Sequence, residues 1–202
     1  MSIATKRGDR GTTGLLYGGR VRKDSVRIEC NGAVDEAQSA LGLARADVVA
    51  ASAAGPAGYS TEELDALLVG IERDLWVLMA EVATTPGRRS RLEPGASLVT
   101  REMVDRLDRH VEELEAAGVM PAEFVVPGQS RPSASLDVAR TIVRRAERHA
   151  VAVGLPQESF VLPYLNRLSD LCWLLARAVE SEHLTARRGG RRRGRQVGAE
   201  AS

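Results

Sequence analysis

The sequence predicts an all-α protein built as a five-helix bundle, and three observations lead to this prediction. In five separate segments, apolar residues recur at alternating intervals of three and four, the period of a helix that buries one face. Aromatic residues make up only 3% of the chain, whereas strands favour aromatic and β-branched side chains. Loops rich in Gly and Pro separate the segments. We therefore expect an up-down arrangement similar to a four-helix bundle. The five segments span residues 34–48, 64–82, 104–114, 136–153 and 165–179.

Residues 1–26 precede the first helix and are Gly-rich, basic and without apolar periodicity. Gly8, Gly11 and Gly14 recur every three residues in TKRGDRGTTG, a spacing that lets backbone N–H groups curl around an anion. The residue order of a P-loop is absent. A flexible basic terminus without a ligand explains the same composition. We expect an arm that is mobile in the free protein, and its composition leaves both interpretations open.

Capping residues mark where two of the helices should begin. A Gly-Pro turn separates the first and second helices, and Ser60 or Thr61 is the expected N-cap of the second. The loop PAEFVVPGQSRPSAS precedes the fourth helix, for which Ser133 or Ser135 is the expected N-cap.

Two charged residues on different helices border the predicted core. Asp35 follows the buried position Val34, and Arg140 follows the buried position Ala139. A half-buried carboxylate needs a cationic partner, so Asp35 and Arg140 are natural partners. Gly42, on the same helix as Asp35, is expected to let another backbone approach closely.

Three arginines on the fourth helix are spaced so that they share one face. Arg140, Arg144 and Arg148 recur every four residues, so on a helix they form one line, here called the arginine stripe. Aligned guanidinium groups repel one another unless something negative lies between them. Because guanidinium forks bind phosphate oxygens in pairs, the stripe suits a polyphosphate.

The fifth helix contains the stretch YLNRLSDLCWLLAR. Asn166 follows the buried position Leu165, so its amide is expected to be half-buried and to have a fixed partner. Arg167 and Asp170 are expected to pair at three-residue spacing.

The Arg/Gly-rich tail at 185–202 has no apolar residues to dock and is expected to be disordered. An arm for nucleic acid or an acidic partner and a solvated tail without a specific role are both compatible with it. The expected organisation is a flexible arm at 1–26, a helical-bundle domain at 27–184 and this disordered tail.

Composition excludes several classes of protein. The net charge of +1 argues for no particular partner, although the charges are segregated along the chain. Cys30 and Cys172 are too few for a disulfide framework or a zinc site, and no histidines stand at metal-ligand spacing within a helix. We therefore expect no protein-ligated metal. Without a membrane-length apolar run or an apolar signal core, a soluble cytoplasmic protein is expected.

Five stretches together resemble one family. TKRGDRGTTGLL, VDEAQSALG, FVVPGQS, VARTIVRRAER and YLNRLSDLCWLLAR occur in the order and rough spacing of the PduO-type ATP:cob(I)alamin adenosyltransferases. The resemblance covers about residues 5–182. It implies a helical bundle that assembles into homotrimers with active sites between subunits. It also implies transfer of the 5′-deoxyadenosyl group of ATP to the cobalt of cob(I)alamin, giving adenosylcobalamin and triphosphate with the assistance of Mg2+.

The resemblance also implies site residues. The expected catalytic residues are Arg144, Arg148, Asn166 and Phe124, with Phe124 packing against the corrin ring. Asp35 and Arg140 match an ion pair between subunits. The residues expected to contact ATP are Thr5, Lys6, Arg7, Gly8, Thr13, Gly14, Lys23, Arg144, Arg145, Glu147, Arg148 and Asn166.

Three positions depart from the family pattern. Gln38 stands where Asn is usual, Gln129 where Gly is frequent, and Asp137 where His or Asn is common. These departures concern the corrinoid side and leave the expected ATP contacts intact.

The chemistry agrees with a site that has no catalytic base. Cob(I)alamin is itself a strong nucleophile, so the protein has to align the 5′ carbon and stabilise the triphosphate leaving group. The expected partners are a cob(II)alamin reductase and an adenosylcobalamin-dependent enzyme that accepts the product. A non-catalytic carrier or sensor that binds ATP or corrinoid is the alternative. A nucleic-acid-binding protein leaves NRLSD and the Gly-rich arm unexplained, so we expect no nucleic acid and no membrane as partners.

Overall fold

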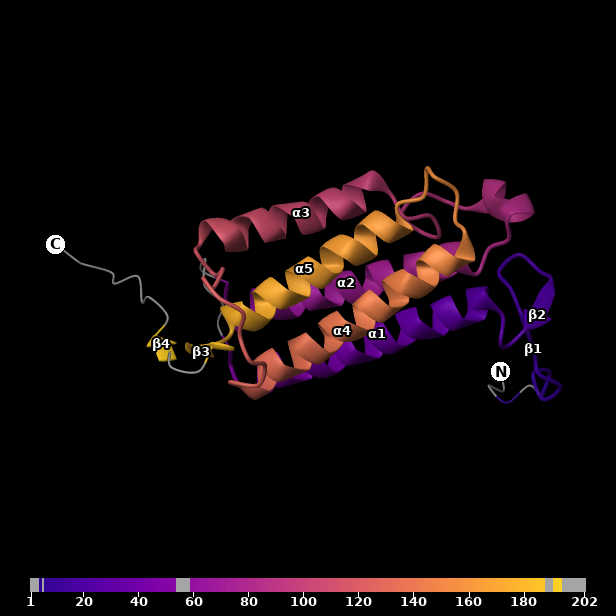
Figure 1. The fold of residues 1–202 in the computed structure, drawn as a ribbon. Coiled ribbons are helices and arrows are strands. Elements are labelled where there is room, and N and C mark those ends of the chain that lie inside the picture. Colours follow the sequence, from indigo (N-terminus) through magenta and orange to yellow (C-terminus); the bar gives the residue numbers. More distant parts are fainter. Residues whose placement is uncertain (1–3, 5, 54–58, 188–190, 194–202) are drawn as a thin grey trace.

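The computed structural model describes residues 4, 6–53, 59–187 and 191–193, and it confirms the all-α bundle (Figure 1). Successive helices run in opposite directions, as expected of an up-down arrangement. A short 3₁₀ helix, η2 (Pro86–Arg91), connects the second and third helices. The five helices are α1 (Val26–Ala50), α2 (Thr61–Val82), α3 (Arg101–Ala116), α4 (Arg131–Val153) and α5 (Val161–Ala178).

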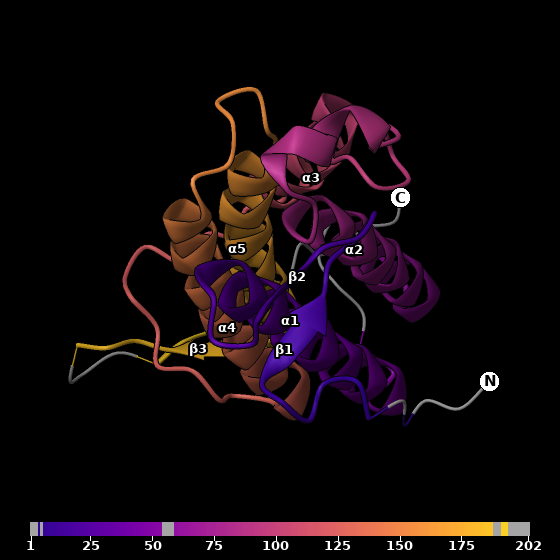
Figure 2. The same cartoon turned by 90° about the vertical axis from the view of Figure 1, so that its right-hand side faces the viewer.

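The core lies along the contact between α1 and α4, with α2 against α1, and with α5 between α4 and α3. Figure 2 shows the same arrangement from one end. Five alanines in α1 and α4 are fully buried, which allows the two backbones to approach closely. They are Ala37, Ala44, Ala139, Ala146 and Ala150. Gly42 has no such role, because a Cβ at this position would meet only the Glu72 side chain, at 3.7 Å, and no backbone.

Helix ends follow the predicted chemistry, with one correction. Ser60 caps α2 in a capping box with Glu63. The N-cap of α4 is Ser130, so the prediction of Ser133 or Ser135 was wrong. Pro132 is compatible with the first turn of a helix, where its missing N–H costs nothing, and α4 therefore begins earlier than the apolar pattern suggested.

Four short strands were not predicted. β1 (Thr12–Gly14) and β2 (Arg20–Arg22) form an antiparallel hairpin in the arm, and β3 (Glu182–Leu184) pairs with β4 (Arg191–Arg193). The arm expected at residues 1–26 therefore contains a regular hairpin, and its mobility in the free protein stays a prediction. Gly18 and Gly19 both have positive φ in the turn, a conformation that tight hairpin turns require. β4 lies within the tail that was expected to be disordered. Residues 188–190 and 194–202 lie outside the described residues, so the disorder of the tail stays a prediction.

The bundle has two distinct ends (Figure 1). At one end, the arm end, the β1–β2 hairpin lies beside the start of α1. The end of α4 and the start of α5 lie at the same end of the bundle. At the other, the loop end, the α3–α4 loop lies beside β3 and β4. None of the described helices combines the length and apolarity that crossing a membrane requires.

Candidate functional site

The arm is docked onto the connection that follows α2. The Leu16 N–H donates to the Ala83 carbonyl at 3.0 Å, and the Arg27 guanidinium donates to the carbonyls of Val82 and, at 2.9 Å, Thr84. The Tyr17 hydroxyl lies 3.4 Å from the Ser97 hydroxyl. These contacts fix the base of the hairpin and leave its first residues projecting from the bundle (Figure 2).

The arm itself forms one tight turn rather than a regular glycine curl. Of the three glycines at three-residue spacing, only Gly11 has a positive φ, at 75°, while Gly14 pairs in β1. The Arg20 guanidinium bonds the Arg7 carbonyl at 2.7 Å and the Thr12 carbonyl at 3.0 Å, which ties the turn to the hairpin. A Cβ on Gly8 would lie 3.0 Å from the Lys23 ammonium, so glycine leaves room there for the lysine side chain.

The cationic side chains of the arm point into solvent. Lys6, Arg7, Arg10 and Lys23 are exposed, and none forms an ion pair with any described residue. Thr13 and Gly14 lie in β1 within the same arm, whereas Thr5 lies outside the described residues. The arm thus presents several uncompensated positive charges, which favour an anion.

Two arginines of the stripe are also uncompensated. Arg144 and Arg148 are exposed on the half of α4 that leads to the arm end. The Arg148 guanidinium donates to the Arg144 carbonyl at 3.0 Å, and within the described part of the chain neither side chain pairs with an acid. Two guanidinium groups one helical turn apart repel each other, and an anion between them relieves that repulsion.

The neighbouring expected residues are already paired within the chain. Arg145 forms an ion pair with Glu36, which joins α4 to α1. Asn166 donates to Glu147 at 3.2 Å, which joins α5 to α4. The expectation that Asn166 is half-buried was wrong, because α5 turns this side chain to solvent; its fixed partner was expected and is present.

Asp35 and Arg140 do not pair within one chain. Arg140 bonds Asp137 at 3.1 Å, and Asp35 is exposed rather than half-buried, with no ion-pair partner among the described residues. Asp137 is buried between Arg140 and Arg177, which gives this departure from the family pattern a structural role. Gln38, another departure, bonds the Glu72 carbonyl at 2.7 Å between α1 and α2.

Phe124 lies in the α3–α4 loop at the loop end, and 87% of its surface is exposed. It therefore does not anchor the loop to the core. With Ala122, Glu123, Ala186 and Arg187 it lines a pocket of about 350 Å³. A large apolar side chain presented to an open pocket suits an apolar ligand face.

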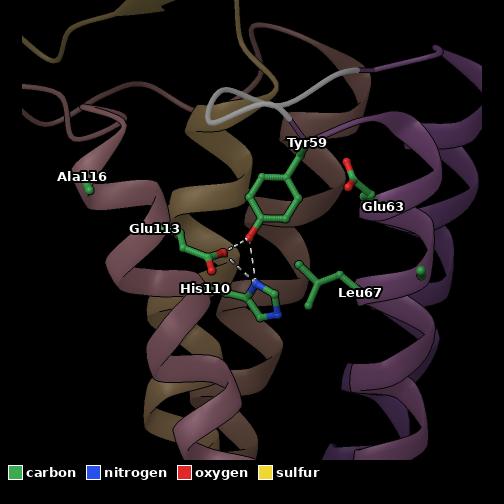
Figure 3. Close-up of a pocket in the computed structure, with 7 residues that line it drawn as sticks. Tyr59, Glu63, Leu67, His110, Glu113 and Ala116 are labelled. Carbon is green, nitrogen blue, oxygen red and sulfur yellow. Dashed lines mark hydrogen bonds and ion pairs between the residues drawn. The ribbon is translucent and has the colours of Figure 1, made fainter.

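A separate groove of about 840 Å³ lies between α2 and α3 (Figure 3). The Tyr59 hydroxyl donates to Glu113 and lies 2.7 Å from His110 Nδ1. Burial, together with the adjacent Glu113, raises the pKa of Tyr59, and the hydrogen bond from Tyr59 lowers the pKa of Glu113. Glu63 and Glu113 make this groove unfavourable for a triphosphate, and it contains none of the predicted site residues.

Neither cysteine is available as a nucleophile. Burial raises the pKa of both Cys30 and Cys172 to about 12, so the thiols stay protonated near neutral pH. Among the described residues, no three or more His, Cys, Asp or Glu side chains gather as they would around a metal ion. The chemistry available at the site is therefore anion binding by arginine, lysine and backbone groups.

A family model described as Cobalamin adenosyltransferase matches residues 3–179 of this chain. The chain belongs to the cobalamin adenosyltransferase family. Its activity is accordingly the transfer of an adenosyl group to cobalamin, and the likeness to PduO-type members predicted from the sequence is confirmed.

Named relatives agree along nearly the whole length of this adenosyltransferase. It is 38% identical to the corrinoid adenosyltransferase of Bacillus subtilis over 183 residues, which cover 90% of this chain and 88% of the relative. It is 39% identical to the cobalamin adenosyltransferase of Cupriavidus metallidurans over 179 residues, or 88% and 87% of the two chains.

Solved structures show the same fold. A variant of the PduO-type ATP:corrinoid adenosyltransferase from Lactobacillus reuteri, complexed with cobalamin and ATP, superposes with a TM-score of 0.71 at 28% identity, covering 88% of this chain and 90% of that one. Another variant from the same organism, complexed with ATP, gives a TM-score of 0.75 at 26% identity, covering 92% and 100%.

Several residues that shape the site were missed by the sequence analysis. Arg20 organises the arm, and Glu81 and Arg177 are charged groups buried at the arm end and the loop end. Arg177 carried a signal, because it interrupts the apolar run LCWLLARAV at the end of the fifth helix. Glu81 likewise stands inside the apolar run of the second helix.

Proposed function

We propose that this chain transfers the 5′-deoxyadenosyl group of ATP to the cobalt of cob(I)alamin and releases triphosphate. The observation that carries the proposal is the pair Arg144 and Arg148, two exposed arginines one turn apart with no acidic partner in the described chain. The basic arm lies at the same end of the bundle, so the two features together suit a triphosphate.

Each part of the ATP site has a separate task. Arg144 and Arg148 would hold phosphate oxygens with guanidinium forks, while Lys6, Arg7 and Lys23 would close over them from the arm. Gly8, Thr13 and Gly14 would supply backbone and hydroxyl groups together with Thr5. Arg145 and the Glu147–Asn166 pair would fix the wall of the site, because both are already anchored between helices.

The corrinoid side is proposed at Phe124. The exposed ring would pack against the lower face of the corrin and exclude both an axial ligand and water from the cobalt. Excluding a lower ligand makes reduction to cob(I)alamin easier. The pocket beside Phe124 supports this placement, since it is open and has the apolar ring in its wall.

The separation of these two parts supports a site shared between subunits of a homotrimer. α4 has 23 residues, so Arg144 lies about 20 Å along the helix axis from the end that adjoins the Phe124 loop, at 1.5 Å per residue. Adenosyl transfer needs the 5′ carbon and the cobalt about 3–3.5 Å apart. A neighbouring subunit would bring its loop end to this arm end, with Asp35 of one subunit pairing with Arg140 of the next.

The reaction needs no protein base. Reduced cobalt attacks the 5′ carbon, the Co–C bond forms, and the C–O bond to triphosphate breaks with its electron pair on the leaving oxygen. The arginines stabilise the charge that develops on triphosphate, which lowers the barrier rather than merely tightening ATP binding.

Mg2+ fits this site chiefly through the substrate. It prefers one or two carboxylates plus phosphate oxygens and waters to a cage of protein ligands. Glu147 is the carboxylate that the proposed ATP residues include, which matches that donor set. When bound, Mg2+ would neutralise phosphate charge, while the arginines orient the oxygens. A cob(II)alamin reductase and an adenosylcobalamin-dependent acceptor enzyme, in the cytoplasm, are the proposed partners.

The test is the kinetics of Arg144→Ala with chemically reduced cobalamin under anaerobic conditions. Loss of one stabilising donor should lower kcat by about 100-fold, as removal of an oxyanion donor does. The matched control is Arg109→Ala on an exposed part of α3, which should leave kcat and KM unchanged. Parameters of Arg144→Ala within about twofold of the parent would overturn the site. Bound ATP and cobalamin without Co–C bond formation or triphosphate release would instead establish the carrier alternative.

A further inference from the structure

A chain of charged side chains crosses the loop end of the bundle. Arg140 bonds Asp137 at 3.1 Å, and Asp137 bonds Arg177 at 2.5 Å. Arg177 in turn bonds Glu180 at 3.0 Å, and Glu180 bonds Nδ1 of His183 at 2.9 Å. Basic and acidic side chains alternate along this chain, which begins on α4, continues through the end of α5 and reaches β3.

The middle of this charge chain is removed from solvent. The Arg177 side chain is 1% exposed and the Glu180 side chain 0%, so each depends on its partners for the stabilisation that water would otherwise give. Both oxygens of Glu180 are used, one by Arg177 and one by His183. The Arg177 guanidinium also lies 5.8 Å from the centre of the Trp173 ring. The side chains of Arg177 and Glu180 are therefore each held in one well-defined position.

His183 connects the charge chain to the loop that carries Phe124. His183 lies in β3, and the next residue, Leu184, accepts a hydrogen bond from the Val126 N–H at 2.7 Å. Two residues later, the Ala186 N–H donates to the carbonyl of Phe124 itself at 2.8 Å. The end of β3 and the segment after it therefore pair with the backbone on both sides of Val125, directly after Phe124.

Packing of the Phe124 side chain contributes little to holding the ring in position. Its ring is 87% exposed, so packing does not hold it, and its backbone contacts with the segment after β3 decide where it points. Ala186 and Arg187 also share the wall of the Phe124 pocket. A shift of β3 would therefore move the ring and reshape the pocket together.

We infer that Glu180 and His183 are positioning residues for Phe124: they anchor β3 to the bundle, and β3 holds the Phe124 loop in place at the corrinoid side. The inference rests on the proposed contact between Phe124 and the corrin ring. It predicts that breaking the Glu180–His183 contact impairs the corrinoid step and leaves ATP binding alone, because the arm end shares no residue with this contact.

The test compares His183→Leu with Phe124→Ala, using cob(II)alamin, a reductant and ATP. A displaced ring should raise KM for cobalamin by about 10- to 100-fold, the cost of a small misplacement, while KM for ATP stays within about twofold. The fraction of bound cob(II)alamin that lacks its lower axial ligand, read from its absorbance and EPR spectra, should fall in both variants. His183→Asn keeps a donor near Nδ1 and should restore much of the loss.

A double variant separates positioning from general damage. If His183 acts through Phe124, the variant carrying both substitutions should be no worse than Phe124→Ala alone. His110→Leu, in the groove between α2 and α3, is the matched control and should leave KM for cobalamin unchanged. Should His183→Leu fail to fold, His183→Ala breaks the same contact, leaves the charge of the buried Glu180 beside Arg177 in place, and replaces it in every comparison.

The outcomes are distinct. An unimpaired Phe124→Ala would overturn the proposed role of Phe124, and the positioning role would fall with it. An impaired Phe124→Ala beside an unimpaired His183→Leu, or His183→Ala in its place, would overturn the positioning role alone. Losses that multiply in the double variant would also overturn it, because the two residues would then act independently.

Discussion

Buried carboxylates hold the loops together at each end of the bundle, but their hydrogen-bond and ion-pair partners differ between the two ends. At the arm end, Glu81 accepts from the Ser159 hydroxyl at 2.6 Å, the Val99 N–H at 2.8 Å and the Arg89 guanidinium at 2.8 Å. Arg89, with a side chain 20% exposed, also reaches Glu158 at 3.9 Å. Glu81 thus joins the α2–α3 connection to the α4–α5 connection through two neutral donors and one partly solvated cation.

At the loop end, the buried acids bond two guanidinium groups and a histidine ring. Asp137 lies between Arg140 and Arg177, and Glu180 lies between Arg177 and His183. Arg177 cannot turn to water, and its Nε atom is buried without a hydrogen-bond partner among the residues that the structure describes. The arm end can therefore lose one contact and relax, whereas the loop end loses its charge balance when any one of its charged side chains is removed.

The largest expected effect is on stability. Asp137→Asn should lower the free energy of unfolding by about 3–5 kcal/mol, because it leaves Arg177 buried with one acid for compensation. Glu81→Gln should cost about 1–3 kcal/mol, since Arg89 can turn toward Glu158 and solvent. Urea denaturation at one fixed protein concentration measures both. Equal losses of stability would contradict the expected difference between the two ends.

Assembly tests whether the two ends of different subunits meet. If Asp35 and Arg140 pair across subunits, Asp35→Ala and Arg140→Ala should each weaken the trimer by about 2 kcal/mol or more, and the double variant should show less than the sum. Truncation is preferable to charge reversal, because an aspartate at 140 would face Asp137.

Sedimentation velocity over a range of concentrations reports the association constant. Asp65→Ala, which removes an acid paired with Arg45 within the chain, is the control and should leave assembly unchanged. Additive losses of association free energy in the double variant would show that Asp35 and Arg140 do not pair across the interface.

Proteolysis compares the two ends directly. Lys6, Arg7 and Arg10 are exposed trypsin sites in the arm, and Arg187 is an exposed site at the loop end. With MgATP at ten times its Kd, cleavage in the arm should slow by about tenfold, because the bound state resists opening. Cleavage after Arg187 is the internal control and should not change. Equal slowing at both sites would mean that ATP stabilises the whole fold rather than the arm.

The smallest effect should come from the thiols. Burial raises the pKa of Cys30 and Cys172 from 9.0 to about 12, so the folded protein keeps both protons where an unfolded chain releases them. Stability from this source is fully present below pH 9.0 and is lost as the pH rises toward about 12. Neither thiol should react with iodoacetamide at pH 8, and both should react in urea. Fast labelling of Cys30 alone in the native protein would show that the arm end opens more readily than the docking contacts indicate.

The positions of the five helices followed from the sequence, because helical periodicity is a local property that repeats within a few residues. The alignment of Arg144 with Arg148, the cap at Ser60 and the Arg167–Asp170 pair at 3.2 Å are local in the same sense. Each depends on neighbours within one turn of helix, so residue spacing was sufficient to predict it.

The partners of the charged groups were decided by the tertiary structure. Asn166 bonds Glu147 and does not pack into the core, and within the chain Arg140 bonds Asp137 rather than Asp35. Both strand pairs join segments that have no periodic pattern. A charge pairs with whatever the fold brings within about 4 Å, and that depends on elements distant in the chain. For the same reason, the separation of Arg144 and Arg148, on the half of α4 near the arm end, from the α3–α4 loop that carries Phe124 became visible only once the helices were packed.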